Sequence, residues 1–205
     1  MKKTVQQIRE EHGRKAAGIL SAYHDEIDRV REIRKPEVDP HLSEYLSDEQ
    51  RMALLRDQKR ERANAAHERA LDAYSAEMDR YQDELDARAT HVKKSLFGMS
   101  SPESAAILSR AAVASEEELG TMLELAADAD NAEVSRAVLL AAERRGFAGL
   151  VARALEHAGE EARELYAEWA EVPPAEVLER QREGVDRIVT PPDYDRLEGT
   201  PLPSY

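Results

Sequence analysis

The sequence predicts an all-α fold: a long antiparallel helical hairpin of the coiled-coil rod type, followed by a bundle of short helices and an extended C-terminal tail. Three observations predict it. Apolar residues recur with the spacing 3, 4, 4 in residues 5–34 and 52–96, proline and turn residues separate these stretches, and helix caps recur after residue 98. Because an eleven-residue repeat gives about 3.67 residues per turn, the apolar rows stay on one face of a nearly straight helix.

The first long helix is expected over residues 4–35, where Val5 and Ile27 belong to one apolar row. Pro36 ends it, since proline lacks a backbone donor and restricts the residue before it. The connection over residues 36–47 holds one expected short helical turn, which begins at Asp39-Pro40. A connection of that length predicts that the helices on either side lie antiparallel.

The second long helix is expected over residues 48–97. Ser47 is a suitable N-cap, because its hydroxyl accepts a hydrogen bond from a first-turn amide while Gln50 reaches back. Gly98 suits the C-terminal end. About fifty helical residues extend for roughly 75 Å. The middle of this helix, residues 63–73, is rich in alanine, so its apolar burial per turn is small and more than two helices are expected to meet there.

The two long helices differ in length, and this predicts a surface that the first helix does not cover. Folded back, residues 4–35 reach only about residues 48–79 of the second helix. Beyond them the apolar row continues through Tyr81, Leu85, Val92 and Leu96. Either the C-terminal half or a second chain must cover these four residues, so we take them as candidate partner-binding residues.

Residues 99–189 are expected to form an acidic bundle of short helices, which gives three domains: 1–98, 99–189 and 190–205. Breaks recur every 13 to 16 residues, and a short solenoid is an alternative to a compact bundle. A last helix is expected over residues 175–189. The predicted caps and breaks are Ser101-Pro102, Ser115 with Glu118, Asp130 with Glu133, Gly146, Gly159 and Pro173-Pro174.

The tail, residues 190–205, contains four prolines, which oppose helix and favour an extended chain. Its spaced apolar anchors are Tyr194, Leu197, Leu202 and Tyr205. An extended segment with such anchors lies readily in a partner's groove, and a terminal segment without a partner is loose. We keep both outcomes open, and count the four anchors among the candidate partner-binding residues.

Composition narrows the classes of function. The net charge of −13 is uneven: residues 1–98 carry a balance of −1 and residues 99–205 one of −12, so nucleic acid is not an expected partner. The chain has no cysteine, which excludes disulfides and thiol chemistry and fits a reducing compartment. Without an apolar run of about eighteen residues or an apolar leader, we expect no membrane partner and a cytoplasmic location, or a place within a virus particle assembled there.

No constellation of residues predicts catalysis. The six histidines never form the i, i+4 pairs of helical metal sites, and glycine-rich phosphate loops and nucleophile elbows are missing from the sequence. His12 lies on the apolar seam and is expected to be a hydrogen-bonded packing residue. We therefore predict a protein that is not an enzyme and that takes no metal, cofactor or small-molecule substrate.

In general character the chain resembles helical scaffold or head-associated proteins of tailed bacteriophages, which are also acidic and cysteine-free and combine a coiled coil with an extended tail. That resemblance implies a structural or assembly protein, a homo-oligomer or part of a larger complex, such as a component of the phage particle. The alternative is a helical adaptor or chaperone-like module that grips a client with the hairpin tip, through Leu42, Tyr45 and Leu46.

Overall fold

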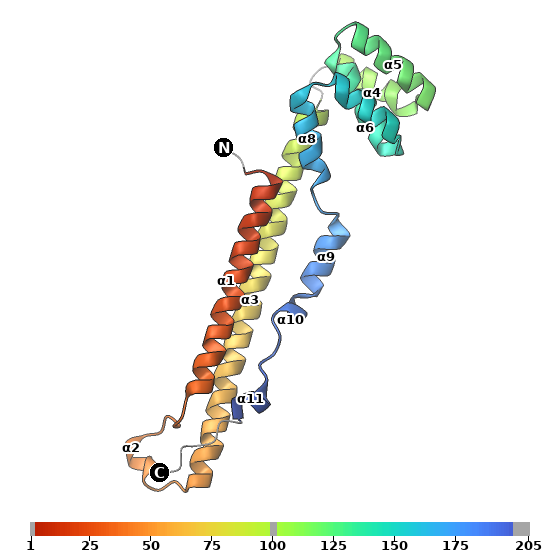
Figure 1. Ribbon diagram of the computed structural model, residues 1–205. Helices are drawn as coiled ribbons and strands as arrows, with labels where there is room; N and C mark the ends of the chain where they lie inside the picture. Colours follow the sequence, from red (N-terminus) through yellow and green to blue (C-terminus); the bar gives the residue numbers. More distant parts are fainter. Residues whose placement is uncertain (1–2, 99–101, 199–205) are drawn as a thin grey trace. The chain divides into compact units, whose positions relative to one another are not determined.

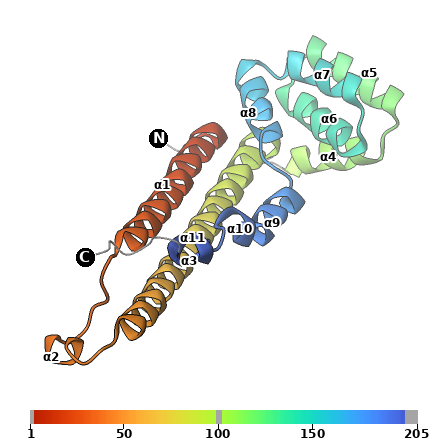
Figure 2. The same ribbon diagram turned by 60° about the horizontal axis from the view of Figure 1, so that its bottom comes forward.

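The computed structural model describes residues 3–98 and 102–198, and every regular element within those ranges is a helix. Two long helices dominate: α1, Val5–Glu32, and α3, Asp48–Phe97. They pack side by side as a hairpin, as Figures 1 and 2 both show. The predicted all-α fold with a long helical hairpin is therefore confirmed, and α3 has the bounds that the sequence predicts.

Local hydrogen bonds define the turn of the hairpin as expected. The side chain of Asp39 accepts from the amide of His41 and caps the short helix α2, Pro40–Ser43. At the start of α3 the Gln50 amide donates to the Ser47 hydroxyl over 3.2 Å, and the Ser47 amide donates to the Gln50 side chain over 2.9 Å. This reciprocal pair satisfies two amides that the first helical turn leaves without partners.

The predicted apolar rows form the interior of the hairpin. The buried residues include Val5, Ala16 and Ile27 of α1, and Tyr74 and Tyr81 of α3. His12 also lies in this seam, where its ring stacks on that of Tyr81 with 4.1 Å between centroids and its Nδ1 lies 3.3 Å from a Glu77 oxygen. His12 is thus the hydrogen-bonded packing histidine that its position on the seam predicts.

The C-terminal part departs from the predicted pattern. The last helix, predicted as one helix over residues 175–189, is two helices. They are α9, Ala175–Glu183, and α10, Val185–Ile188, with Gly184 between them. The tail is not wholly extended, because Tyr194–Glu198 form the short helix α11. Two of the four prolines, Pro191 and Pro192, precede this helix, and Asp193 accepts a hydrogen bond from the Arg196 amide at its start. We call residues 175–198 the C-terminal segment.

Five short helices precede this segment and enclose an apolar core that includes Leu119, Val138 and Leu139. Ser115 and Glu118 form the predicted capping box. The next cap is Asn131 and not Asp130, because the Asn131 side chain accepts from two first-turn amides while Asp130 adopts a left-handed backbone conformation. The five helices are α4, Pro102–Val113; α5, Glu116–Asp128; α6, Ala132–Arg145; α7, Ala148–His157; and α8, Glu160–Ala170.

Packing divides the chain into two units that differ from the predicted domains. One unit holds residues 1–7 and 84–173, and the other holds residues 8–83 and 174–205. The division falls inside α3 and not at its end near residue 98. The reason is that the last turns of α3 pack with the short helices, since Leu96 and Phe97 belong to their apolar core. We describe each unit by itself.

The apolar row beyond residue 79 is covered by the chain itself. Tyr81, Leu85, Val92 and Leu96 are all buried. Close to this row, the Glu168 carboxylate of α8 accepts from the Val5 amide over 2.9 Å and pairs with Arg88 over 2.5 Å. Of the two alternatives that the prediction left open, cover within the same chain therefore holds: His12 of α1 stacks on Tyr81, and Leu96 belongs to the core of the short helices.

Candidate protein-association surfaces

An open groove runs along one flank of the hairpin, within the unit of residues 8–83 and 174–205. It consists of two adjoining hollows of about 250 and 560 Å³ that share Ile19, Ala22 and Ala73. Most of its lining is small or apolar, and several of these side chains are exposed. The lining residues without charge, which define the open groove, are Gly18, Ile19, Ala22, Tyr23, Ala66, Ala70, Ala73 and Ala76.

Charged residues of opposite sign face each other across the open groove. Glu26 of α1 lies 3.7 Å from Arg69 of α3, and Glu11 of α1 lies 3.4 Å from Arg80 of α3. Between these two levels the positions are reversed, with Lys15 on α1 and Glu77 on α3. At each of these three positions along the hairpin, which we call charge levels, one helix carries a cation and the other an anion.

Glu77 is the most buried charge of the groove and belongs to a small polar cluster. Arg80 donates to it over 2.8 and 2.5 Å, and His12 lies within 3.3 Å. The hydrogen bond from Arg80 is the largest influence and holds the pKa of the Glu77 carboxyl below its usual value, against the opposing effect of burial. Since a buried carboxylate is stable only with such partners, this cluster fixes the floor of the groove.

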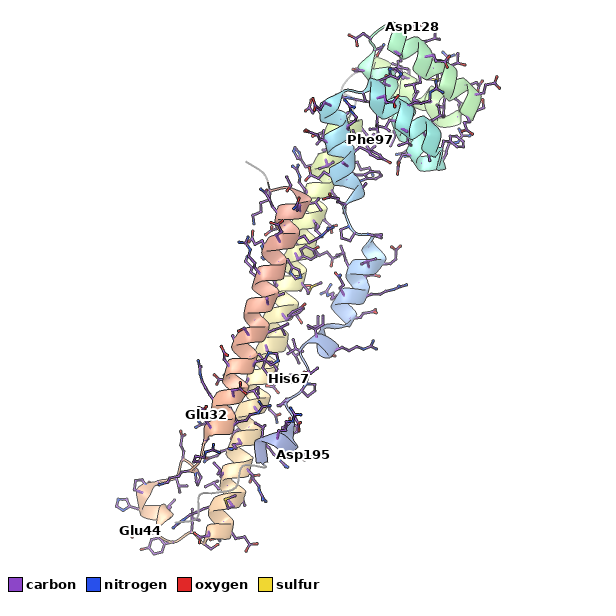
Figure 3. The ribbon with its side chains drawn as sticks, viewed as in Figure 1. Glu32, Glu44, His67, Phe97, Asp128 and Asp195 are labelled. Atoms are coloured by element: carbon purple, nitrogen blue, oxygen red, sulfur yellow. The ribbon has the colours of Figure 1, made fainter. Side chains whose placement is uncertain are left out.

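The opposite flank of the hairpin is filled by the C-terminal segment. Three side chains of the hairpin donate to backbone carbonyls of that segment: Tyr23 to Thr190 over 2.8 Å, His67 to Val189 over 2.9 Å, and Lys59 to Leu197 over 3.2 Å. Figure 3 labels His67 on the hairpin and Asp195 in the C-terminal segment. The tyrosine hydroxyl and the lysine ammonium are donors here, and because a carbonyl oxygen only accepts, His67 donates from its Nε2–H. Polar groups that would otherwise be buried without partners are satisfied in this way.

Apolar contacts complete the filled flank. Val189 and Leu197 are fully buried, and Val185 is nearly so. The ammonium of Lys59 also donates to the Arg31 carbonyl over 3.0 Å, and its burial, more than the nearby Arg34, lowers its pKa. The C-terminal segment is thus an integral third layer of the hairpin.

Helical periodicity separates the groove from the contacts that Asn64 and His67 make with the C-terminal segment, whereas the buried Tyr23 and Lys59 reach that segment from the seam between the helices. At about 100° per residue, Ala66, Ala73 and Arg80 share the groove side of the helix. Asn64 and His67, which contact the C-terminal segment, point to the other side. The buried row that contains Ala70 and Tyr74 runs between them. The C-terminal segment therefore leaves the open groove uncovered.

The hairpin tip, residues 36–47, carries the most exposed large apolar side chains near the turn. Leu42 is 61% exposed and Tyr45 is 84% exposed, whereas Leu46 is half-buried. Figure 1 shows α2 in the loop that joins the two long helices. The structure therefore leaves two of the three predicted tip residues accessible to a partner.

The predicted tail anchors have different surroundings. Tyr194 is half-buried, its hydroxyl donates to the Asn64 side chain, and the Arg60 guanidinium lies 5.9 Å from its ring centroid. Leu197 is fully buried against its own chain, so its side chain is not exposed to a partner in this structure. Leu202 and Tyr205 lie outside the described residues.

The unit of residues 1–7 and 84–173 presents a different surface, which is acidic. Glu116, Glu117 and Glu124 line a hollow of about 630 Å³ between α5 and the start of α7. Arg153 pairs with Glu124 across it over 3.0 Å. Glu116 and Glu117 lie in the first turn of α5, where the helix dipole favours acidic residues, and Glu124 is a solvated charge farther along the same helix.

No grouping of three or more metal-ligating side chains occurs among residues 3–98 and 102–198. Within the same ranges no helix is long and apolar enough to cross a membrane. Comparison with known protein families, with curated proteins and with solved structures finds no match for this chain. What the fold defines is a class, an all-helical protein built on a long hairpin.

The open groove was only partly foreseen from the sequence. The alanine-rich stretch predicts that helices meet there, and its residues line the groove. The charged residues on its rim could not be predicted as a group, because in the sequence they are ordinary surface residues of amphipathic helices. They are Glu11, Glu26, Arg69 and Arg80. Only the register in which α1 and α3 pack brings these charges face to face.

Proposed function

We propose that this chain is a non-enzymatic structural protein that works by assembling with other protein chains. The observation that carries the proposal is the open groove, an apolar strip of small residues on the outside of an otherwise well-filled hairpin. Small side chains let another helix approach closely, so that the shallow interior of the hairpin gains further burial. A component of a larger particle, such as that of a bacteriophage, is one setting in which such a protein works.

The native mass of the purified full-length chain, with any co-purifying component, tests this proposal. We expect an assembly heavier than one chain. Ala22→Glu should dissociate it, because the substitution places a charge in the groove. Ala17→Glu is the matched control, since Ala17 is an exposed alanine of the same helix that does not line the groove. A single-chain mass without any associated component overturns the proposal.

A second candidate function is a helical adaptor that grips a client with the hairpin tip. The exposure of Leu42 and Tyr45 favours it, because large apolar side chains at the end of a hairpin are available to a partner's pocket. The double substitution Leu42→Ser and Tyr45→Ser should then abolish capture of the client and leave the groove-dependent assembly intact. Unchanged capture excludes this second function.

A further inference from the structure

We propose that the open groove binds the same groove of a second copy of this chain, which forms a four-helix dimer of two hairpins related by a two-fold axis parallel to α1 and α3. This inference rests on the proposed function and names the partner. The groove belongs entirely to the unit of residues 8–83 and 174–205, and its lining is supplied by both long helices.

The arrangement of charges selects the second copy. A half-turn about an axis parallel to the helices places α1 of one copy over α3 of the other at the same level along the hairpin. Glu26 then faces the partner's Arg69, and Glu11 faces the partner's Arg80. Within one chain these groups already lie at matching levels, as the distances of 3.7 and 3.4 Å across the groove establish.

The middle level adds no pair between the copies, because Glu77 is 8% exposed and is held by Arg80 and His12 of its own chain. A two-fold axis repeats every contact, because the interface uses the same patch on both copies. The two outer levels therefore give four pairs of opposite charges.

The other two-fold arrangement is disfavoured by the same charges. An axis perpendicular to the helices places α3 of one copy antiparallel on α3 of the other. The exposed charges of the α3 rim are the cations Arg69 and Arg80, since Glu77 between them is buried, so cations would face cations across that contact. Like charges held opposite each other at an interface suppress that mode of association.

The lining of the groove fits a helical pair of this kind. Gly18, Ala22, Ala73 and Ala76 are exposed and small, and a Cβ added at Gly18 meets no atom within 4 Å. Flat faces of small residues pack closely, as in the interior of four-helix bundles. The strip between the outer charge levels, Glu11 to Glu26, is about 22 Å long, and a two-helix face of that length covers about 450 Å² per copy.

That area lies below the roughly 800 Å² per partner of a standard interface, so the dimer is weak and depends on concentration. Sedimentation equilibrium of the full-length chain over a concentration series measures it. We expect a monomer–dimer equilibrium in the parent chain and in Ala17→Glu, and a monomer in Ala22→Glu. Circular dichroism shows whether each variant keeps the helical content of the parent.

Charge reversal provides the decisive test of the pairing. Glu26→Arg alone places Arg against the partner's Arg69, and Arg69→Glu alone places Glu against the partner's Glu26. Each variant should weaken its own dimer by roughly tenfold or more. Mixing the two variants should restore association, because both trans pairs of the mixed dimer again join opposite charges.

Restoration in the mixture cannot arise from repair within one chain, since each chain keeps two like charges at this level. A parent chain that stays monomeric at every concentration overturns the inference, as does a mixture that associates no better than its components. If Ala22→Glu releases a different co-purifying protein while self-association is missing, the second copy is excluded and the proposed function stands.

Discussion

The two flanks of the hairpin differ in what covers them and in the chemistry that covering requires. The filled flank buries Val189 and Leu197 of the C-terminal segment and satisfies its carbonyls with donors from Tyr23, Lys59 and His67. The open flank has small side chains and paired rim charges, and such exposed ion pairs contribute little to stability. The flank that is covered within the chain thus has hydrogen-bond donors and buried apolar side chains, whereas the uncovered flank has alanine residues and charged side chains.

Removing an anchor of the filled flank should have the largest effect. Leu197→Ala is expected to lower the free energy of unfolding by about 2–5 kcal/mol, because it leaves a cavity in a fully buried site. Urea unfolding measures the loss, and amide hydrogen exchange over residues 189–198 shows where the structure opens. Ile188→Ala, at a 41% exposed position of the same segment, is the control. Equal losses for the two variants contradict the third-layer role of the segment.

The second largest effect is expected from acid, which should weaken the hydrogen bonds of Glu77 in the floor of the open groove. The pKa of Glu77 is lower in the folded chain than in the unfolded one, so its contribution is fully present above the ordinary carboxyl pKa of about 4.3 and is lost as pH falls through the lowered value. Glu77→Gln should lose about 1.5–3 kcal/mol at neutral pH, since it replaces a charge-assisted bond. Its stability should then fall less steeply in acid than that of the parent.

Thermal unfolding across an acid pH series measures this difference. Glu68→Gln, at an exposed position of the same helix, should leave the acid slope unchanged. Parallel curves for the parent chain and Glu77→Gln would show that the carboxylate is not held by Arg80 and His12 in solution.

A single hydrogen bond of the filled flank should have a smaller effect. Tyr23→Phe removes the donor to the Thr190 carbonyl and keeps the ring, so we expect a loss of about 0.5–1.5 kcal/mol in urea unfolding. Burial raises the pKa of the Tyr23 hydroxyl, which keeps it protonated as the donor. Tyr45→Phe, which changes an exposed hydroxyl at the hairpin tip, should have no measurable effect. Losses of the same size in both variants would exclude a specific bond at Tyr23.

The smallest effect concerns the empty space of the open flank. Gly18→Ala should stabilise the monomer by about 0.5–1 kcal/mol, because alanine favours helix and the added methyl meets no neighbour. Gly13→Ala should give the same gain, since Gly13 has equally free space in the same helix. Thermal unfolding of dilute samples compares them. A gain at Gly13 with a loss at Gly18 would show that the groove is filled in the monomer.

Much of the fold was predictable, because its signals are local. The apolar spacing, the Ser47 and Gln50 cap and Gly98 define a helix whose observed bounds match the prediction. Where local signals compete, prediction failed: Asn131 caps the helix in place of its neighbour Asp130, because only the backbone conformation decides between the two. The helix α11 was also missed, and it forms in the proline-rich tail directly after Pro191, Pro192 and Asp193.

The sequence by itself determined the helices, their caps and the apolar rows, since periodicity and capping act within a few turns of one chain. Only the tertiary structure decided which rows are covered. It buries Leu85 and Leu197 within the chain, and leaves Ala22 and Ala73 on an open flank. The physical reason is that apolar burial has no direction, so an apolar row specifies that something must cover it and not which segment does so.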